Sequence, residues 1–229
     1  MKPIMAASLM CIDYLHVKDN MEAINRHCDI LHADVLDGHF RKNVTLSPDF
    51  VKVVRGLSDL PMDIHLMVTN PLDFIDIFSD CGATYMSVHF ETIAGQETEV
   101  FDKIRSNGFK TGMVVNPETS LEQFAPWLPH IDLLTIMTVH PGFAGSPFVW
   151  EAVDKLRAAA DIIQENGYPC IIQADGSINK NTYKPLWEAG SRMFVMGSTG
   201  LFGLNDDLDK AGLQMKQEIV EATDRKSVV

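Results

Sequence analysis

Four side chains that can bind a metal ion or transfer a proton lie in short apolar segments of the sequence. His32 and Asp34 are two positions apart in LHADVLDG, so on a strand both side chains point to the same face. His65 lies in DIHLMV and Asp175 in IIQADGS. Buried carboxylates need partners, because burying an unpaired charge is costly. Two His and two Asp that converge favour a site for one divalent ion, with Zn²⁺, Fe²⁺, Mn²⁺, Co²⁺ and Mg²⁺ as candidates. Each histidine taken alone also fits an ordinary place in a protein core.

A second group of residues has the composition of a phosphate-binding site. Glycine turns let backbone N–H groups approach an anion closely, and here they follow three apolar segments. The residues are Gly142, Phe143, Ala144 and Gly145 in PGFAGS, Gly176 and Ser177 in ADGS, and Gly197 and Ser198 in MGSTGLF. Residues 198–203 could form the short extra helix that often completes such sites in barrel enzymes. The alternative is that these turns only connect strands to helices.

The elements that carry these residues repeat as a β-rich segment, a loop and a segment of helical period. The eight expected strands are 4–10, 30–36, 62–68, 84–90, 110–115, 133–139, 170–175 and 192–196. The eight expected helices are 17–27, 48–57, 72–81, 97–107, 121–128, 148–165, 181–189 and 206–223. This alternation predicts a single α/β domain over residues 1–229, a (β/α)₈ TIM barrel. An open doubly wound sheet shares the alternation, but no GxGxxG sequence follows the first expected strand.

In a barrel, polar residues near the carboxyl ends of the strands face the active site. Besides the four residues above, this position holds Ser8, His89, Glu91 and Asn116. Leu36, Met67 and Met137 are candidates for an apolar wall, although methionine in a strand is usually core filler. The polar segment 38–45 follows the second strand and is either a lid that excludes water or an ordinary surface loop.

The composition argues against several classes of protein. Of the 229 residues, 46% are hydrophobic and 22% are charged, as in ordinary globular proteins. The net charge of −12 argues against nucleic acid and acidic membranes as partners. No apolar run is long enough for a membrane span, and the four cysteines are scattered without a CxxC pair. These features predict a cytoplasmic protein with reduced cysteines.

The sequence resembles the ribulose-phosphate 3-epimerase family over essentially its whole length. The motifs HADVLDGHF, DIHLMV, IMTVHPGFAG, ADGS and MGSTGLF carry the resemblance, in this order and spacing. The resemblance implies a metal-dependent isomerase that inverts C3 of a ketose phosphate through a cis-enediolate. It implies a metal site at His32, Asp34, His65 and Asp175, with Asp34 and Asp175 as the acid/base residues. Ser8, His65 and Asp175 match substrate contacts, the glycine turns match phosphate contacts, and we expect a homo-oligomer.

The substrate is less well defined than the reaction. Within the family, SLMCID, TLSPDFV and the GLF ending resemble enzymes that convert D-allulose 6-phosphate to D-fructose 6-phosphate. We therefore expect this six-carbon substrate, with D-ribulose 5-phosphate as the alternative. His140, Ser146 and the Arg41-Lys42 pair depart from the family pattern and bear on specificity, and Leu36 replaces a usual Met.

Two other functions remain as alternatives. One is another barrel enzyme with the same phosphate site, such as a phosphosugar isomerase or an aldolase. A Schiff-base aldolase needs a lysine in the lumen near a strand's carboxyl end, whereas Lys110 lies at the start of its strand. A non-catalytic sugar-phosphate-binding barrel would not need the His and Asp residues that this sequence retains.

Overall fold

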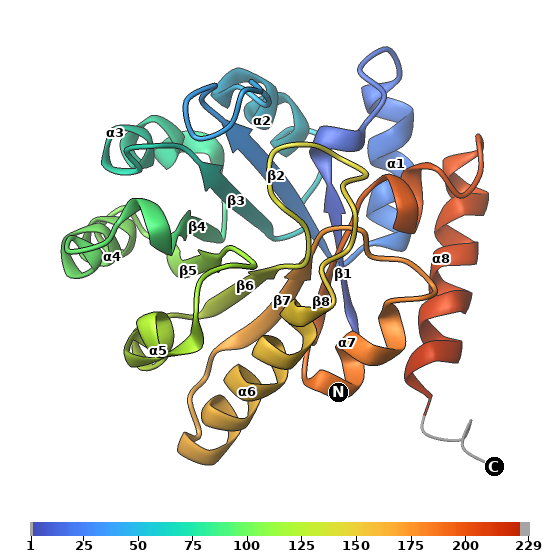
Figure 1. Cartoon of the computed structure of the whole chain (residues 1–229). Coiled ribbons are helices and arrows are strands. Elements are labelled where there is room, and N and C mark those ends of the chain that lie inside the picture. Colours follow the sequence, from blue (N-terminus) through green and yellow to red (C-terminus); the bar gives the residue numbers. More distant parts are fainter. Residues whose placement is uncertain (1, 225–229) are drawn as a thin grey trace.

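Eight parallel strands form the centre of the molecule. The computed structural model describes residues 2–224, so the predicted domain limits at 1 and 229 lie outside the described residues. The strands pair in chain order and close into a barrel (Figure 1). They are β1 Ile4–Ser8, β2 Ile30–Leu36, β3 Met62–Met67, β4 Tyr85–His89, β5 Lys110–Val115, β6 Leu133–Met137, β7 Ile171–Asp175 and β8 Met193–Met196. Because β1 pairs with β8, the sheet is closed, which confirms the predicted (β/α)₈ barrel.

Helical segments connect successive strands and surround the barrel (Figure 1). The α-helices are α1 Val17–His27, α2 Pro48–Arg55, α3 Leu72–Ile75, α4 Glu97–Ser106, α5 Leu121–Phe124, α6 Glu151–Asn166, α7 Tyr183–Ala189 and α8 Leu208–Thr223. Short 3₁₀ segments cover Leu9–Cys11, Asp76–Cys81, Phe90–Thr92 and Ala125–His130. The predicted short helix after β8 is present as a π-helical turn, Ser198–Phe202. No helix among residues 2–224 is long and apolar enough to cross a membrane.

Three expected helices differ from the prediction in type or by more than two residues. The segment 72–81 divides into α3 and a 3₁₀ segment. In the segment 121–128, α5 continues for one turn only, because Pro126 and Pro129 provide no N–H for helical hydrogen bonds. The helix expected from residue 148 begins at Glu151, because the backbone N–H of Val149 donates to the Thr138 carbonyl (2.7 Å) and holds this segment against the end of β6.

Strand alternation separates the core from the lumen. In β2, Leu31, Ala33 and Val35 belong to the apolar core between the barrel and the helices. The intervening residues, including His32 and Asp34, therefore face the lumen. The strand register then sets which lumen residues are neighbours, with His65 of β3 opposite Asp34. Because all strands are parallel, their carboxyl ends open at the same end of the barrel.

Candidate active site

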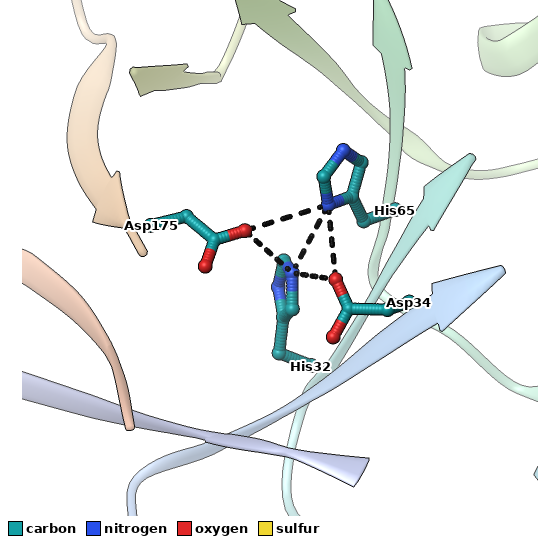
Figure 2. Close-up of side chains that lie close together, drawn as sticks. All are labelled: His32, Asp34, His65 and Asp175. Atoms are coloured by element: carbon teal, nitrogen blue, oxygen red, sulfur yellow. Dashed lines mark hydrogen bonds and ion pairs between the residues drawn. The ribbon is translucent and has the colours of Figure 1, made fainter. Parts of the chain in front are cut away.

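Two histidines and two aspartates from three strands form a buried cluster in the lumen (Figure 2). Their ligand atoms are His32 Nε2, Asp34 Oδ1, His65 Nδ1 and Asp175 Oδ2. The two nitrogens are 3.3 Å apart, and they lie 3.2 Å from the Asp34 oxygen and 3.5 and 3.6 Å from the Asp175 oxygen. Four ligands at the usual bond lengths around a tetrahedral ion are about 3.3 to 3.6 Å apart. The predicted residues therefore converge, and their donor atoms and spacing fit one divalent ion.

The charges within the cluster depend on one another. Burial opposes ionisation of Asp34, but the neighbouring His32 and His65 lower its pKa well below the usual range. The same balance lowers the pKa of Asp175, because both histidines hydrogen-bond to it. Burial also disfavours charge on His32, yet Asp34 and the other nearby carboxylates raise its pKa. The carboxylates are consequently ionised near neutral pH, which is the form that binds a cation.

A third carboxylate supports His32 from the side away from the cluster. His32 Nδ1 lies 3.1 Å from Oδ2 of the fully buried Asp63, and neither atom has another hydrogen-bond partner. The hydroxyl of Ser87 donates to the other oxygen of Asp63 (2.6 Å). Gly112 leaves room for this contact, because a Cβ there would lie 2.0 Å from Ser87 Oγ. A carboxylate behind a metal-binding histidine orients the ring and fixes its tautomer. Sequence reasoning missed Asp63, although an aspartate two residues before His65 in an apolar strand was a usable signal.

The predicted phosphate residues line a single cleft above the cluster. Ser8, Asp34, Met67, Met137 and Asp175 also line it. The glycine-turn residues in the lining are Gly142, Phe143, Ala144, Gly145, Gly176, Ser177, Gly197 and Ser198. The Ser8 hydroxyl donates to Asp34 Oδ2 (2.8 Å), the oxygen outside the cluster. Lining residues that the sequence reasoning did not assign are Met10, Cys11, Val139, Pro141, Val195 and Thr199.

This lining does not include the cluster residues His32 and His65, nor three residues that were predicted for specificity or for the wall of the site. His140 is exposed, and its Nδ1 lies 2.7 Å from Glu118 Oε1. The Ser146 hydroxyl donates to the Phe143 carbonyl (3.1 Å) and so supports the turn. Leu36 is buried, and its backbone N–H donates to Thr45 Oγ1 (3.0 Å). None of these three side chains lines the cleft. Their predicted roles in specificity or in the wall of the site stay predictions.

The segment 38–45 contacts the loop that follows β6. Arg41 Nε donates to the Pro141 carbonyl (3.2 Å), and Asn43 Nδ2 donates to the Gly142 carbonyl (2.8 Å). Gly142 has a φ of +119°, and a Cβ there would lie 2.8 Å from Arg41 Cγ. The segment is thus attached to the edge of the cleft by two side chains.

Fold and cluster together define the class of protein: a (β/α)₈ barrel with a buried His/Asp site that fits one divalent ion. Residues 4–202 match the model of the ribulose-phosphate 3-epimerase family, and the chain belongs to this family. It is accordingly an isomerase that acts on carbohydrate phosphates.

Curated relatives extend over most of the chain. The ribulose-phosphate 3-epimerase of Mycobacterium tuberculosis is 36% identical over 204 residues, which cover 89% of this chain and 88% of that protein. The protein of the same name from Bacillus subtilis is 34% identical over 203 residues, 88% of this chain and 93% of the relative. Their names refer to ribulose phosphate, and neither supports the expected preference for the six-carbon sugar.

Solved structures with low sequence identity share the fold. KGPDC from Streptococcus mutans has a TM-score of 0.69 and 13% identity, with 97% of this chain and 99% of that chain covered. A tryptophan synthase α-subunit mutant from Pyrococcus furiosus has a TM-score of 0.67 and 14% identity, with 96% and 97% covered. At this identity the likeness concerns the barrel alone.

Proposed function

We propose that the protein interconverts D-ribulose 5-phosphate and D-xylulose 5-phosphate by inverting C3. The observation that carries this proposal is the position of Asp34 and Asp175, which belong to the cluster and also line the cleft beside the glycine turns. The five-carbon substrate is supported by the names of the relatives. The sequence-based predictions of a homo-oligomer and a cytoplasmic location remain predictions.

The proposed reaction begins with loss of the C3 proton next to the C2 carbonyl of the ketose. A divalent ion held by His32, Asp34, His65 and Asp175 would act as a Lewis acid that stabilises the negative charge developing on the substrate oxygens. Asp34 removes the C3 proton from one face of the ketose, which leaves an enediolate, and Asp175 donates a proton to C3 from the opposite face. Two carboxylates are needed because a single base cannot readily serve both faces, and their roles exchange in the reverse direction. When a turnover starts, one must be ionised and the other protonated, so the acid has to take up a proton that the free site, with its lowered carboxylate pKa values, does not hold.

The glycine turns are proposed to hold the substrate phosphate. Backbone N–H groups at Gly142–Gly145, Gly176-Ser177 and Gly197-Ser198 form the anion site, next to the π-helical turn after β8. This grip would keep C3 near the two carboxylates, and it explains how a protein with net charge −12 binds an anion.

D-Allulose 6-phosphate is the second candidate substrate. Met10 and Cys11 belong to SLMCID, one of the sequences that resemble six-carbon enzymes, and both line the cleft. Burial raises the pKa of Cys11 to about 11, so this thiol is neutral at physiological pH. These two side chains would contact the additional carbon of a hexulose.

Parallel assays with the two sugar phosphates test the proposal. The metal-loaded protein is given each substrate in D₂O, and NMR follows inversion and deuterium uptake at C3. We expect kcat/KM to be at least tenfold higher for D-ribulose 5-phosphate, with deuterium in the product. A preference for D-allulose 6-phosphate would overturn the substrate assignment but keep the reaction. Absence of C3 exchange with both sugars would overturn the reaction itself.

A further inference from the structure

A second line of polar side chains runs from the cluster to the end of β4. His65 Nε2, on the side of the ring away from the cluster, lies 2.9 Å from Nε2 of His89. Nδ1 of His89 lies 3.2 Å from Oε2 of Glu91. The proposed reaction uses neither His89 nor Glu91, although both belong to the strand-end polar residues identified in the sequence.

The Glu91 end of this line carries a fixed negative charge. Oε1 of Glu91 accepts hydrogen bonds from the Asn116 backbone N–H (2.8 Å) and the Thr119 hydroxyl. Burial works against ionisation of Glu91, but the hydrogen bonds from His89, Thr119 and Asn116 hold its pKa at about 2. Lys155 anchors the adjoining backbone, because its Nζ donates to the carbonyls of Asn116 (2.8 Å) and Pro117 (2.6 Å). An ionised carboxylate can only accept hydrogen bonds, so Glu91 requires a donor from His89.

Hydrogen-bond chemistry then determines the proton positions on both histidines. Since Glu91 only accepts, the Nδ1 of His89 carries the proton. A neutral imidazole has one donor and one acceptor nitrogen, so His89 Nε2 is an acceptor. His65 Nε2 must therefore carry a proton and donate it to His89. In the cluster itself, His65 Nδ1 lies 3.2 Å from the Asp34 carboxylate, to which it donates a proton when no ion is bound. When a metal ion replaces that proton, His65 keeps the proton on Nε2 and directs the Nδ1 lone pair at the ion.

Packing leaves His89 little freedom to change this arrangement. Its side chain is fully buried. The centroid of the His89 ring lies 5.0 Å from the centroid of the His65 ring and 4.6 Å from the centroid of the Phe40 ring. Rotation of the His89 ring would break the contacts with both polar neighbours.

We propose that His89 and Glu91 are positioning residues that hold His65 in the tautomer able to bind the metal ion. This inference rests on the proposed metal site. It gives the two metal-binding histidines matching supports, since Asp63 faces His32 directly and Glu91 acts on His65 through His89. Loss of such a support typically weakens metal binding about 10- to 100-fold.

The tautomer of His89 provides a test that does not depend on metal. Two-bond ¹H–¹⁵N correlation spectra of ¹⁵N-histidine-labelled protein distinguish Nδ1–H from Nε2–H forms, and the His89→Gln variant assigns the His89 signals. At pH 7 we expect the Nδ1–H form of His89 with and without Zn²⁺. An Nε2–H form in wild-type protein would overturn the proposal.

Metal affinity provides the second test, with Co²⁺ as the probe in competition calorimetry. Glu91→Gln keeps the shape of the side chain, but its amide NH₂ faces one of the three groups that donate to Glu91, which belong to His89, Asn116 and Thr119. The hydrogen-bond chain to His65 is weakened as a result, so we expect the dissociation constant for Co²⁺ to rise about 10- to 100-fold. Glu118→Gln is the matched control, because Glu118 pairs with exposed His140 away from the cleft, and it should bind as wild type. Equal affinity of Glu91→Gln and Glu118→Gln would overturn the positioning role.

A pair of His89 variants covers the case in which Glu91→Gln fails to fold. The amide oxygen of His89→Gln can accept from His65 Nε2–H, whereas His89→Leu cannot. We expect His89→Gln to bind Co²⁺ more tightly than His89→Leu, and equal affinities would contradict the proposal. If wild-type protein binds no Co²⁺, the proposed metal site is wrong. The NMR measurement of the His89 tautomer still tests the hydrogen-bond chain in that case, because it does not depend on metal.

Discussion

At the scale of single residues, Asp34 and Asp175 are similar in type but differ in surroundings. The oxygen of Asp34 outside the cluster accepts a hydrogen bond from Ser8, and the Asp34 side chain is 5% exposed. The Asp175 side chain is 12% exposed and lines the cleft between the turns after β6 and β8. Different surroundings give two carboxylates different proton affinities, which an acid and base pair requires.

Replacing either carboxylate should separate proton removal from inversion. In Asp34→Asn and Asp175→Asn we expect inversion at C3 to fall at least about 10³-fold, since positioned acid/base groups contribute about 10²- to 10⁴-fold each. Each variant retains one base, so one epimer should still exchange its C3 proton with D₂O without inverting. NMR at saturating metal measures both rates, and circular dichroism checks folding. Near-wild-type inversion in either variant would contradict the two-base assignment.

Residue types and local spacing identified the two carboxylates and the two histidines of the cluster as candidates. The period of two residues along a strand was sufficient to place His32 and Asp34 on one face. The supporting roles of Asp63 and His89 were not predictable in this way, because their partners lie on neighbouring strands. His140 lies three residues after β6, and its exposed side chain pairs with Glu118, so its influence on specificity stays a prediction.

At the scale of elements, the loop after β2 and the loop after β6 act as one rim of the cleft. The Asp37 carboxylate shapes the first loop by accepting from the backbone N–H groups of His39 and Phe40 (both 2.8 Å) and of Thr69 (2.8 Å). Asn43 then reaches the second loop at Gly142. The segment 38–45, whether a lid or a surface loop, therefore has a structural connection to the proposed phosphate site.

Removing this connection should affect substrate binding more than metal binding. In Asn43→Ala we expect KM for the sugar phosphate to rise about 2- to 13-fold, because the hydrogen bond to the Gly142 carbonyl, of about 0.5 to 1.5 kcal/mol, is lost. The Co²⁺ affinity should stay within twofold of wild type. Val44→Ala, at an exposed and uncharged position in the same loop, serves as the control. An unchanged KM in Asn43→Ala would identify the segment as an ordinary surface loop.

At the scale of the whole molecule, the cluster joins strands from different parts of the barrel. β2 and β3 are neighbours, whereas β7 is separated from β2 by β8 and β1. An ion bound by all three strands would link the first third of the chain to its last quarter. Such binding occurs in the folded state only, so it stabilises that state by mass action.

Metal removal should consequently lower thermal stability. With free Zn²⁺ at 100 times its dissociation constant, the stabilisation is about 2.7 kcal/mol. For a domain of this size, this corresponds to a rise in Tm of about 5 to 11 °C over the chelated protein. Differential scanning calorimetry measures the shift, and the Asp175→Asn variant should show a smaller one. Equal Tm values for loaded and chelated wild-type protein would contradict a metal site in the lumen.

The sequence by itself determined the succession of eight strands and helical segments, the lumen face of β2 and the glycine turns of the cleft. These features depend on periodicity and on turn residues, which act over a few positions along the chain. The family also follows from the sequence, since its motifs keep their order and spacing.

Only the tertiary structure decided which atoms meet. The spacing of 33 residues between His32 and His65, and of 141 between Asp34 and Asp175, carries no information on distance until strand register and barrel closure bring the side chains together. The line from His65 to Glu91 and the contact between Asn43 and Gly142 have the same origin. Contacts between distant segments depend on how elements pack, and local sequence patterns do not encode that packing residue by residue.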